Sequence, residues 1–171
     1  SIRSVKRFMA DHEYTTPWTP PRTERAKPLK VGVVGAGPGG LTAALRLAQR
    51  GYQVTVFEKL PIPGGMMAVG IPEYRLPTDQ LMAEVAHIER AGVELRYNQA
   101  LGRDFTLDEL FAREGCHAVV LAIGAHRSRK LGVPGEEQAG VLPGTDFLRA
   151  VGLVNRGGGA GYTLPDMQGS E

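Results

Sequence analysis

Cysteine is nearly absent, since Cys116 is the single one among 171 residues. One cysteine excludes an internal disulfide, and it excludes a metal or iron–sulfur site built only from cysteines of this segment. It also favours a reducing compartment, so we expect a cytoplasmic location. Beside an apolar segment, such a thiol is more often a core residue than a redox group, and no C-x-x-C pattern supports disulfide chemistry.

Long apolar runs and a strong charge of one sign are missing as well. No stretch approaches the roughly 18 consecutive apolar residues that a membrane span needs, and the first residues do not have the pattern of a signal peptide. The 20 Lys and Arg against 18 Asp and Glu leave a formal net charge of +2. That charge is too small to predict a nucleic-acid or anionic-membrane partner. Apolar residues still make up 42% of the chain, which indicates a packed core.

The spacing of the apolar residues predicts alternating strands and helices. We expect strands at residues 29–34, 53–57, 93–97 and 118–123, the last one buried, and helices at residues 1–14, 41–50, 78–91, 106–113 and 145–155. Thr78 and Thr106 are expected to cap the helices that they begin. A strand, a glycine turn, a helix and a strand within about 30 residues make a βαβ unit, which implies a parallel sheet.

Glycine is the residue in excess, at 23 of 171, roughly twice its average share. Residues 35–40 read Gly-Ala-Gly-Pro-Gly-Gly, and Gly35, Gly37 and Gly40 fit the pattern G-x-G-x-x-G. The motif is informative because it follows an expected strand and precedes an expected helix. The first glycine allows a tight turn, the second lets a pyrophosphate approach, and the third lets helix and strand pack closely. A helix N-terminus here would also attract phosphates.

Glu58 ends the second expected strand, 58 − 35 = 23 residues after the first glycine of the motif. An acid at this place accepts hydrogen bonds from a ribose hydroxyl and disfavours a 2′-phosphate by like-charge repulsion. The pattern therefore predicts FAD or NAD in this site, rather than NADP.

The long loop at residues 59–77 separates these two alternatives. A plain NAD-binding dehydrogenase normally continues with further strand–helix units, whereas here a Gly- and Pro-rich loop follows and ends in Gly-Ile-Pro-Glu-Tyr-Arg-Leu-Pro at 70–77. Together with the glycine motif, Glu58 and the strand end Ala-Ile-Gly-Ala at 122–125, this loop resembles the glutamate synthase small-subunit (beta chain) family of FAD-dependent NAD(P)H oxidoreductases. The resemblance covers roughly residues 1–155.

The resemblance implies a Rossmann-like, three-layer α/β domain that binds FAD, as an incomplete part of a flavoprotein with two dinucleotide-binding domains. Gly64 and Gly65 would let the chain pass close to the flavin, and Met66 with the 70–72 segment would lie near its ring. Arg75 would serve a phosphate or hold the loop by an ion pair. The expected cofactor-binding residues are Gly35, Gly37, Pro38, Gly39, Gly40, Glu58, Lys59, Gly64, Gly65, Met66, Gly70, Ile71, Pro72, Arg75, Ala100, Leu101, Ala122 and Gly124.

The same resemblance sets expectations for organisation and partners. Residues 1–28 would be a helix and a Pro-rich linker that follow a [4Fe–4S]-binding region, residues 29–155 the FAD-binding domain, and residues 156–171 a Gly-rich linker toward a separate NAD(P)H-binding domain. Electrons would pass between the nicotinamide cofactor and iron–sulfur centres or a partner subunit within a hetero-oligomeric complex. No catalytic side chain and no metal ligand is assigned, because the chemistry belongs to the flavin.

Some features depart from this pattern or leave alternatives open. Ala68 and Val69 stand where many members carry a basic residue and Tyr, and Thr78 stands where Lys often follows, so the resemblance is to a divergent branch. One alternative is an FAD-binding electron-transfer or scaffold subunit without substrate chemistry, and another is a simple NAD-binding dehydrogenase domain. The basic run at residues 126–130 is interpreted as a solvated loop, with a docking surface as its alternative.

Overall fold

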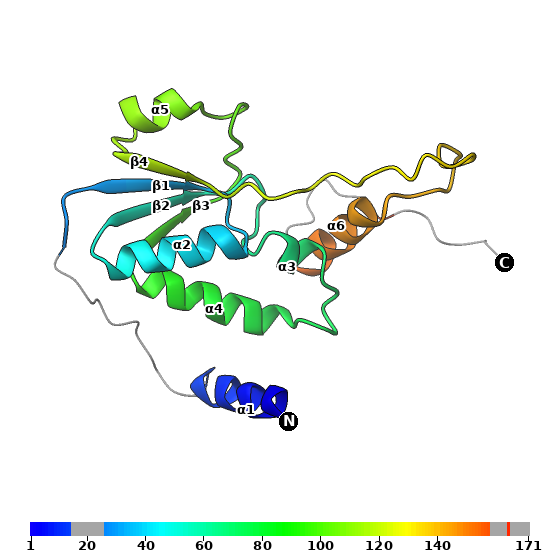
Figure 1. Cartoon of the computed structure of the whole chain (residues 1–171), viewed down its shortest axis with the longest axis horizontal. Helices are drawn as coiled ribbons and strands as arrows, with labels where there is room; N and C mark the ends of the chain where they lie inside the picture. The colour runs from blue at the N-terminus through cyan, green and yellow to red at the C-terminus, as the bar shows by residue number, and fades with distance from the viewer. Residues whose placement is uncertain (15–25, 158–163, 165–171) are drawn as a thin grey trace.

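A computed structural model of the chain describes residues 1–14, 26–157 and 164 (Figure 1). Most of the two expected linkers, at residues 15–25 and beyond 157, lies outside the described residues. The elements are α1 (Ile2–Tyr14), β1 (Lys30–Val34), α2 (Pro38–Gln49), β2 (Gln53–Phe57), α3 (Met66–Val69), α4 (Thr78–Arg90), β3 (Val93–Arg96), α5 (Leu107–Ala112), β4 (Ala118–Leu121) and α6 (Gly144–Asn155).

The four strands form one parallel sheet in the order β3-β2-β1-β4. The chain builds outward from β1 to β3 and then crosses back to place β4 on the other side of β1. Val34 is level with Phe57 of β2 and with Leu121 of β4, so these three strands end together. In such a sheet the gap between β1 and β4 is the point where the strand order reverses, and ligands bind beyond the carboxyl ends there.

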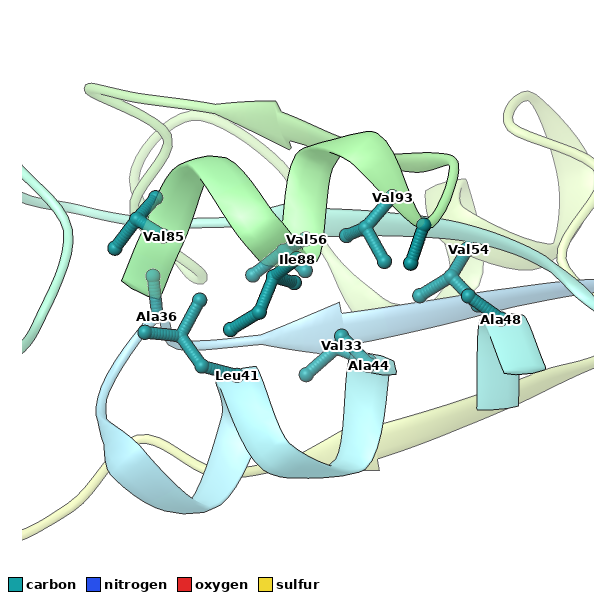
Figure 2. Close-up of a cluster of buried hydrophobic side chains, with 11 residues drawn as sticks. Val33, Ala36, Leu41, Ala44, Ala48, Val54, Val56, Val85, Ile88 and Val93 are labelled. Carbon is teal, nitrogen blue, oxygen red and sulfur yellow. The ribbon is translucent and has the colours of Figure 1, made fainter. Parts of the chain in front are cut away.

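The helices α2 and α4 lie along one face of the sheet and the short helix α5 lies on the other side, which gives the three layers expected from the sequence (Figure 1). On one face, α2 and α4 pack on the strands through small and branched side chains, including Ala44 and Ala48 of α2 and Val85 and Ile88 of α4 (Figure 2). On the other face, a second cluster holds Phe105, Leu110 and Cys116, among others, beside the carboxyl half of β1 and β2. Burial of this apolar surface fixes the strand ends that form the site.

Several sequence-based expectations need correction. The helix expected from residue 41 begins at Pro38, inside the expected glycine turn, and the unpatterned loop at 59–77 contains the short helix α3. The apolar strand at 118–123 is not buried: β4 ends at Leu121 and lies at an edge of the sheet, so that Leu121 and Ile123 are 55% and 57% exposed. The apolar composition of β4 does not reveal its edge position, where it pairs with β1 alone among the strands of the described residues.

The two expected helix caps have different outcomes. The hydroxyl of Thr106 accepts from the backbone N–H of Glu109, and the Glu109 carboxylate accepts from the N–H of Thr106, which is the expected reciprocal cap. Thr78, by contrast, does not cap α4. Its hydroxyl donates to the carboxylate of Glu73 at 2.6 Å, and Pro77 occupies the cap position.

The loop before α4 is held from the opposite end of the chain by α6. Gly152 of α6 packs directly on α3, since a Cβ there would lie 2.7 Å from the carbonyl oxygen of Ala68. Arg156, only 8% exposed, donates to the backbone oxygens of Met67, Ile71 and Leu76 at 3.4, 3.3 and 2.7 Å. The sequence places Arg156 in the expected Gly-rich linker, but in the structure its side chain holds the 66–76 loop.

Replacing Arg156 with Met should therefore destabilise the fold. The Arg156→Met variant keeps the length of the side chain but removes the donor of three part-buried hydrogen bonds to backbone carbonyls, which costs about 2 kcal/mol of unfolding free energy. Urea unfolding measures this loss. The matched control is Arg90→Met, which also removes a cation from the C-terminal end of a helix but at an exposed position, and should change the unfolding free energy by less than about 0.5 kcal/mol. Equal losses in both variants would contradict the assignment.

Candidate dinucleotide-binding site

A cleft of about 770 Å³ lies beyond the carboxyl ends of the strands. Its wall is formed by residues at or after the carboxyl ends of β1, β2, β3 and β4 and by the first residues of α2 and α3. This is the place where the strand order reverses, so the fold and the cleft indicate the same ligand position.

The glycine turn at 35–40 forms one side of this cleft, and its first and third glycines are required by packing. Gly35 has a positive φ of 106°, and a Cβ on it would lie 2.4 Å from the carbonyl oxygen of Ala122. A Cβ on Gly40 would lie 1.9 Å from the carbonyl oxygen of Gly35. A side chain at Gly35 would push the turn away from β4. A side chain at Gly40 would push α2 away from the turn.

Gly37 and Gly39 are different, because their missing side chains leave space rather than a close contact. A Cβ on Gly37 would have its nearest neighbour at 3.9 Å, and one on Gly39 would meet no described atom within 4 Å. Both residues line the cleft. Gly37 is the N-cap of α2 with Pro38 following it, and no side chain of the described residues caps this helix. Unpaired N–H groups and the positive end of the helix dipole therefore face the cleft, as an anion site requires.

A second glycine turn packs against the first. The N–H of Gly64 donates to the carbonyl oxygen of Ala36 at 2.8 Å. Gly65 has φ 53° and ψ −130°, and a Cβ there would lie 2.8 Å from the Cα of Gly37. Helix α3 begins directly after this contact, and its first residue, Met66, lines the cleft. Backbone atoms thus join the 59–77 loop to the glycine turn at residues 35–40.

Glu58 connects the two turns from within the protein. Its side chain is 5% exposed, and its two carboxylate oxygens accept from the backbone N–H groups of Ala36, at 2.6 Å, and Leu60, at 2.8 Å. Each oxygen keeps a further lone pair, and Glu58 borders the cleft. The carboxylate can therefore accept a hydroxyl group of a ligand while it holds the glycine turn against the end of β2.

The structure brings twelve of the eighteen expected residues to the cleft wall. They are Gly35, Gly37, Pro38, Gly39, Glu58, Lys59, Gly65, Met66, Ala100, Leu101, Ala122 and Gly124. Gly40 and Gly64 lie behind this wall as packing residues. The 70–72 segment instead borders a separate small cavity of about 50 Å³ beside α6. Arg75 is exposed, with its guanidinium carbon 5.7 Å from the centre of the Tyr74 ring, and does not border the cleft.

Six residues of the cleft wall were not expected from the sequence: Val34, Phe57, Gln99, Ile123, His126 and Arg127. His126 and Arg127 belong to the run that we interpreted as a solvated loop. Arg127 is exposed, in agreement with that interpretation, whereas His126 is half-buried. The available signal was their position just after Gly124, beyond the end of a strand in a parallel sheet. Burial, together with the cations of Lys59 and Arg149, lowers the pKa of His126 below its ordinary value.

Other chemistries find less support. Cys116 is buried, and burial raises the pKa of its thiol, which agrees with a core residue. Within the described residues, no group of three or more His, Cys, Asp or Glu could hold a metal ion. The same part of the chain contains no helix with the length and apolar character needed to cross a membrane.

Comparison with known proteins assigns the class. Residues 29–156 match the family model described as pyridine nucleotide-disulphide oxidoreductase, and the chain belongs to this family. It is 42% identical to the beta subunit of the NADP(+)-dependent formate dehydrogenase of Moorella thermoacetica over 90% of this chain and 25% of that subunit. It is 35% identical to the small chain of glutamate synthase [NADPH] of Azospirillum brasilense over 92% of this chain and 32% of that protein.

A solved structure agrees with this assignment. Mycobacterium tuberculosis FprA, in complex with NADPH, superposes with a TM-score of 0.60 at 27% identity, over 72% of this chain and 28% of that one. The resemblance to glutamate synthase small chains and the α/β fold expected from the sequence are thereby confirmed. The chain spans about a quarter to a third of the length of these relatives. It is therefore similar to one part of NAD(P)H-dependent oxidoreductase subunits.

Glu58→Gln tests the role of the buried carboxylate in the fold of the site. A carboxamide can accept from one of the two N–H groups, but its NH₂ group then faces the other, so the variant should lose about 2 kcal/mol of unfolding free energy. Urea unfolding at neutral pH measures this. Glu137→Gln removes the same charge from an exposed residue and serves as control. A Glu58→Gln variant as stable as this control would show that the two hydrogen bonds do not hold the turn.

Proposed function

We propose that the chain is the FAD-binding part of an NAD(P)H-dependent oxidoreductase, which passes electrons between a nicotinamide cofactor and iron–sulfur centres or a partner subunit. The observation that carries this proposal is the uncapped N-terminus of α2, which opens onto the cleft through Gly37 and Gly39 with Glu58 beside it. Such an arrangement fits a dinucleotide, since it offers N–H donors for phosphates and an acceptor for a ribose hydroxyl.

The residues that would hold FAD each have a distinct task. The backbone at Gly37–Gly39 and the first turn of α2 would bind the pyrophosphate, and the free lone pairs of Glu58 would accept from a ribose hydroxyl. The backbone at Ala100 and Leu101 would border the adenosine, and Gly65 and Met66 would border the flavin portion. Lys59 and Arg127 add positive charge to the cleft wall, which favours an anionic ligand.

The position of Glu58 favours FAD over NADP in this cleft. A 2′-phosphate on the adenosine ribose would bring two negative charges against a buried carboxylate that is already held by backbone N–H groups. The two relatives are named as NADP(+)- and NADPH-dependent enzymes, and those proteins are three to four times longer than the matched segment. We therefore assign the nicotinamide cofactor to a site outside this chain.

The chemistry itself would be supplied by the bound flavin, which accepts a hydride from a nicotinamide and can pass electrons on singly. The chain's own residues need to bind, orient and shield it. The apolar part of the wall, with Val34, Phe57 and Ile123, would shield part of the bound flavin from water. No side chain of the chain is required as an acid or a base for this transfer.

The proposed partners follow from the relatives of the chain and from its cysteine content. The formate dehydrogenase relative is a beta subunit, which supports a place in a hetero-oligomeric complex. The [4Fe–4S] clusters would be bound by a region outside residues 1–171 or by a partner, because this chain has only one cysteine. Neither a nucleic acid nor a membrane is proposed as a partner, and the cytoplasmic location remains a prediction.

A pair of glycine substitutions tests the phosphate site without disturbing the fold. Gly37 has ordinary extended angles and room for a Cβ, so Gly37→Ala should unfold like the wild type. Its Cβ would occupy the space through which the pyrophosphate approaches the backbone, and FAD affinity should fall at least about tenfold. Gly144→Ala adds the same methyl group at the exposed start of α6, where a Cβ would meet no described atom within 4 Å and the residue does not border the cleft, and it should bind FAD like the wild type. Flavin fluorescence quenching measures both affinities.

The outcomes of this comparison separate the alternatives. If the wild-type chain binds NAD but not FAD, the simple dehydrogenase alternative holds and our proposal is wrong. If FAD binds and Gly37→Ala binds it equally well, the cofactor lies elsewhere. Enzyme and scaffold are distinguished by adding NADPH or NADH anaerobically to a protein that carries this chain together with a nicotinamide site. The enzyme proposal predicts bleaching of the flavin absorbance band, and the scaffold alternative predicts none.

A further inference from the structure

Helix α6 holds two segments of the cleft wall, although none of its own residues borders the cleft. Near its middle, Arg149 donates to the carbonyl oxygen of His126, a residue of the wall, at 2.5 Å. At its end, Arg156 donates to three backbone oxygens of the 66–76 loop, whose first residue, Met66, also borders the cleft. One helix is therefore bonded both to the chain after β4 and to the loop after β2.

Both arginines lie on the face of α6 that packs on α3 (Figure 1). Arg149, Gly152 and Arg156 are spaced i, i+3, i+7, which places them on one side of a helix. Gly152 lets the two helices touch, and the next residue, Leu153, is fully buried in one apolar cluster with Ala68 of α3. Two helical turns, about 10 Å, thus separate the two points at which α6 holds the wall.

Arg156 also joins two parts of the 66–76 loop that the backbone leaves separate. Residues 66–70 form a first turn and residues 72–76 a second, and each is closed by its own backbone hydrogen bonds. Within the described residues, no backbone hydrogen bond connects one turn with the other. Arg156, 8% exposed, spans them because it donates to the oxygen of Met67 in the first turn and to that of Leu76 in the second. The shape of the loop therefore depends on a side chain of α6.

We propose that α6 is a positioning element of the cofactor site, in which Arg149 and Arg156 keep the chain after β4 and the 66–76 loop at the spacing that the flavin portion of FAD needs. This inference rests on the proposed function and deepens it, because it assigns the flavin end of the cleft to side chains that touch no ligand. The adenosine diphosphate portion is held elsewhere, by the first turn of α2 and Glu58. Neither arginine is hydrogen-bonded to these groups.

A comparison of FAD with ADP separates positioning from general stability. ADP carries the adenosine and the phosphates but no flavin, so a variant that is merely less folded should lose apparent affinity for both ligands alike. Arg149→Met and Arg156→Met should each weaken FAD binding about tenfold and leave ADP binding within about twofold of the wild type. Arg156→Lys keeps a cation that can donate to some of the carbonyl groups, and should recover part of the loss. Isothermal titration calorimetry of the chain measures both affinities.

The matched control is Lys30→Met. The Lys30 side chain is 22% exposed, as is that of Arg149, and its ammonium group lies 3.2 Å from the carboxylate of Glu114. It stands at the amino end of β1, whereas the cleft lies beyond the carboxyl ends of the strands. Lys30→Met therefore removes a half-buried cation far from the site, and its ratio of FAD affinity to ADP affinity should equal that of the wild type.

The visible circular dichroism of bound flavin gives a second readout, since it follows the surroundings of the ring and not the stability of the fold. At saturating FAD we expect altered flavin bands in Arg149→Met and Arg156→Met, and wild-type bands in Lys30→Met. A ratio of FAD affinity to ADP affinity within about twofold of the wild type in either arginine variant, or an equal fall of this ratio in Lys30→Met, would overturn the inference while the proposed function stands. Failure of the wild-type chain to bind FAD would overturn both.

Discussion

The hydrogen bonds from Ala36 and Leu60 to the carboxylate of Glu58 are the interaction on which the site depends. They join the turn after β1 to the exit of β2, and the Gly64 N–H continues this connection to the second glycine turn. A buried carboxylate is stable only when such donors surround it. Here those donors belong to the turn after β1 and to the exit of β2, so the residue that would receive a ribose also holds these two segments together.

Glycine makes this arrangement possible because three segments of backbone meet with no room between them. Gly35 touches the strand end at Ala122, Gly40 lies on Gly35, and Gly65 lies on Gly37. Each contact excludes a Cβ, and together they bring β4, α2 and the 59–77 loop around one space. Gly37 and Gly39 have no such neighbours on their open side, and the positive end of α2 faces the cleft there. The surplus of glycine noted in the sequence thus serves both packing and access.

Much of this architecture could be predicted from the sequence, because strand, turn, helix and acid follow one another within a single βαβ unit. Features set by distant segments could not. The apolar run of β4 predicts burial, but its edge position in the sheet leaves Leu121 and Ile123 exposed. The fastening of the 66–76 loop by Arg156 joins residues 80 or more apart in the sequence. His126 sits in a run of basic residues that resembles a solvated loop, and only the return of the chain past β1 brings it to the cleft.

The central claim is that the cleft between the glycine turn, Glu58 and the end of β4 holds FAD, with its pyrophosphate at the N-terminus of α2. The measurement that tests it most directly is a crystal structure of the chain grown with FAD. We predict the pyrophosphate within hydrogen-bonding distance of the backbone at Gly37–Gly39, and a ribose hydroxyl on the carboxylate of Glu58. A dinucleotide seated elsewhere, or one whose phosphates avoid the first turn of α2, would contradict the account.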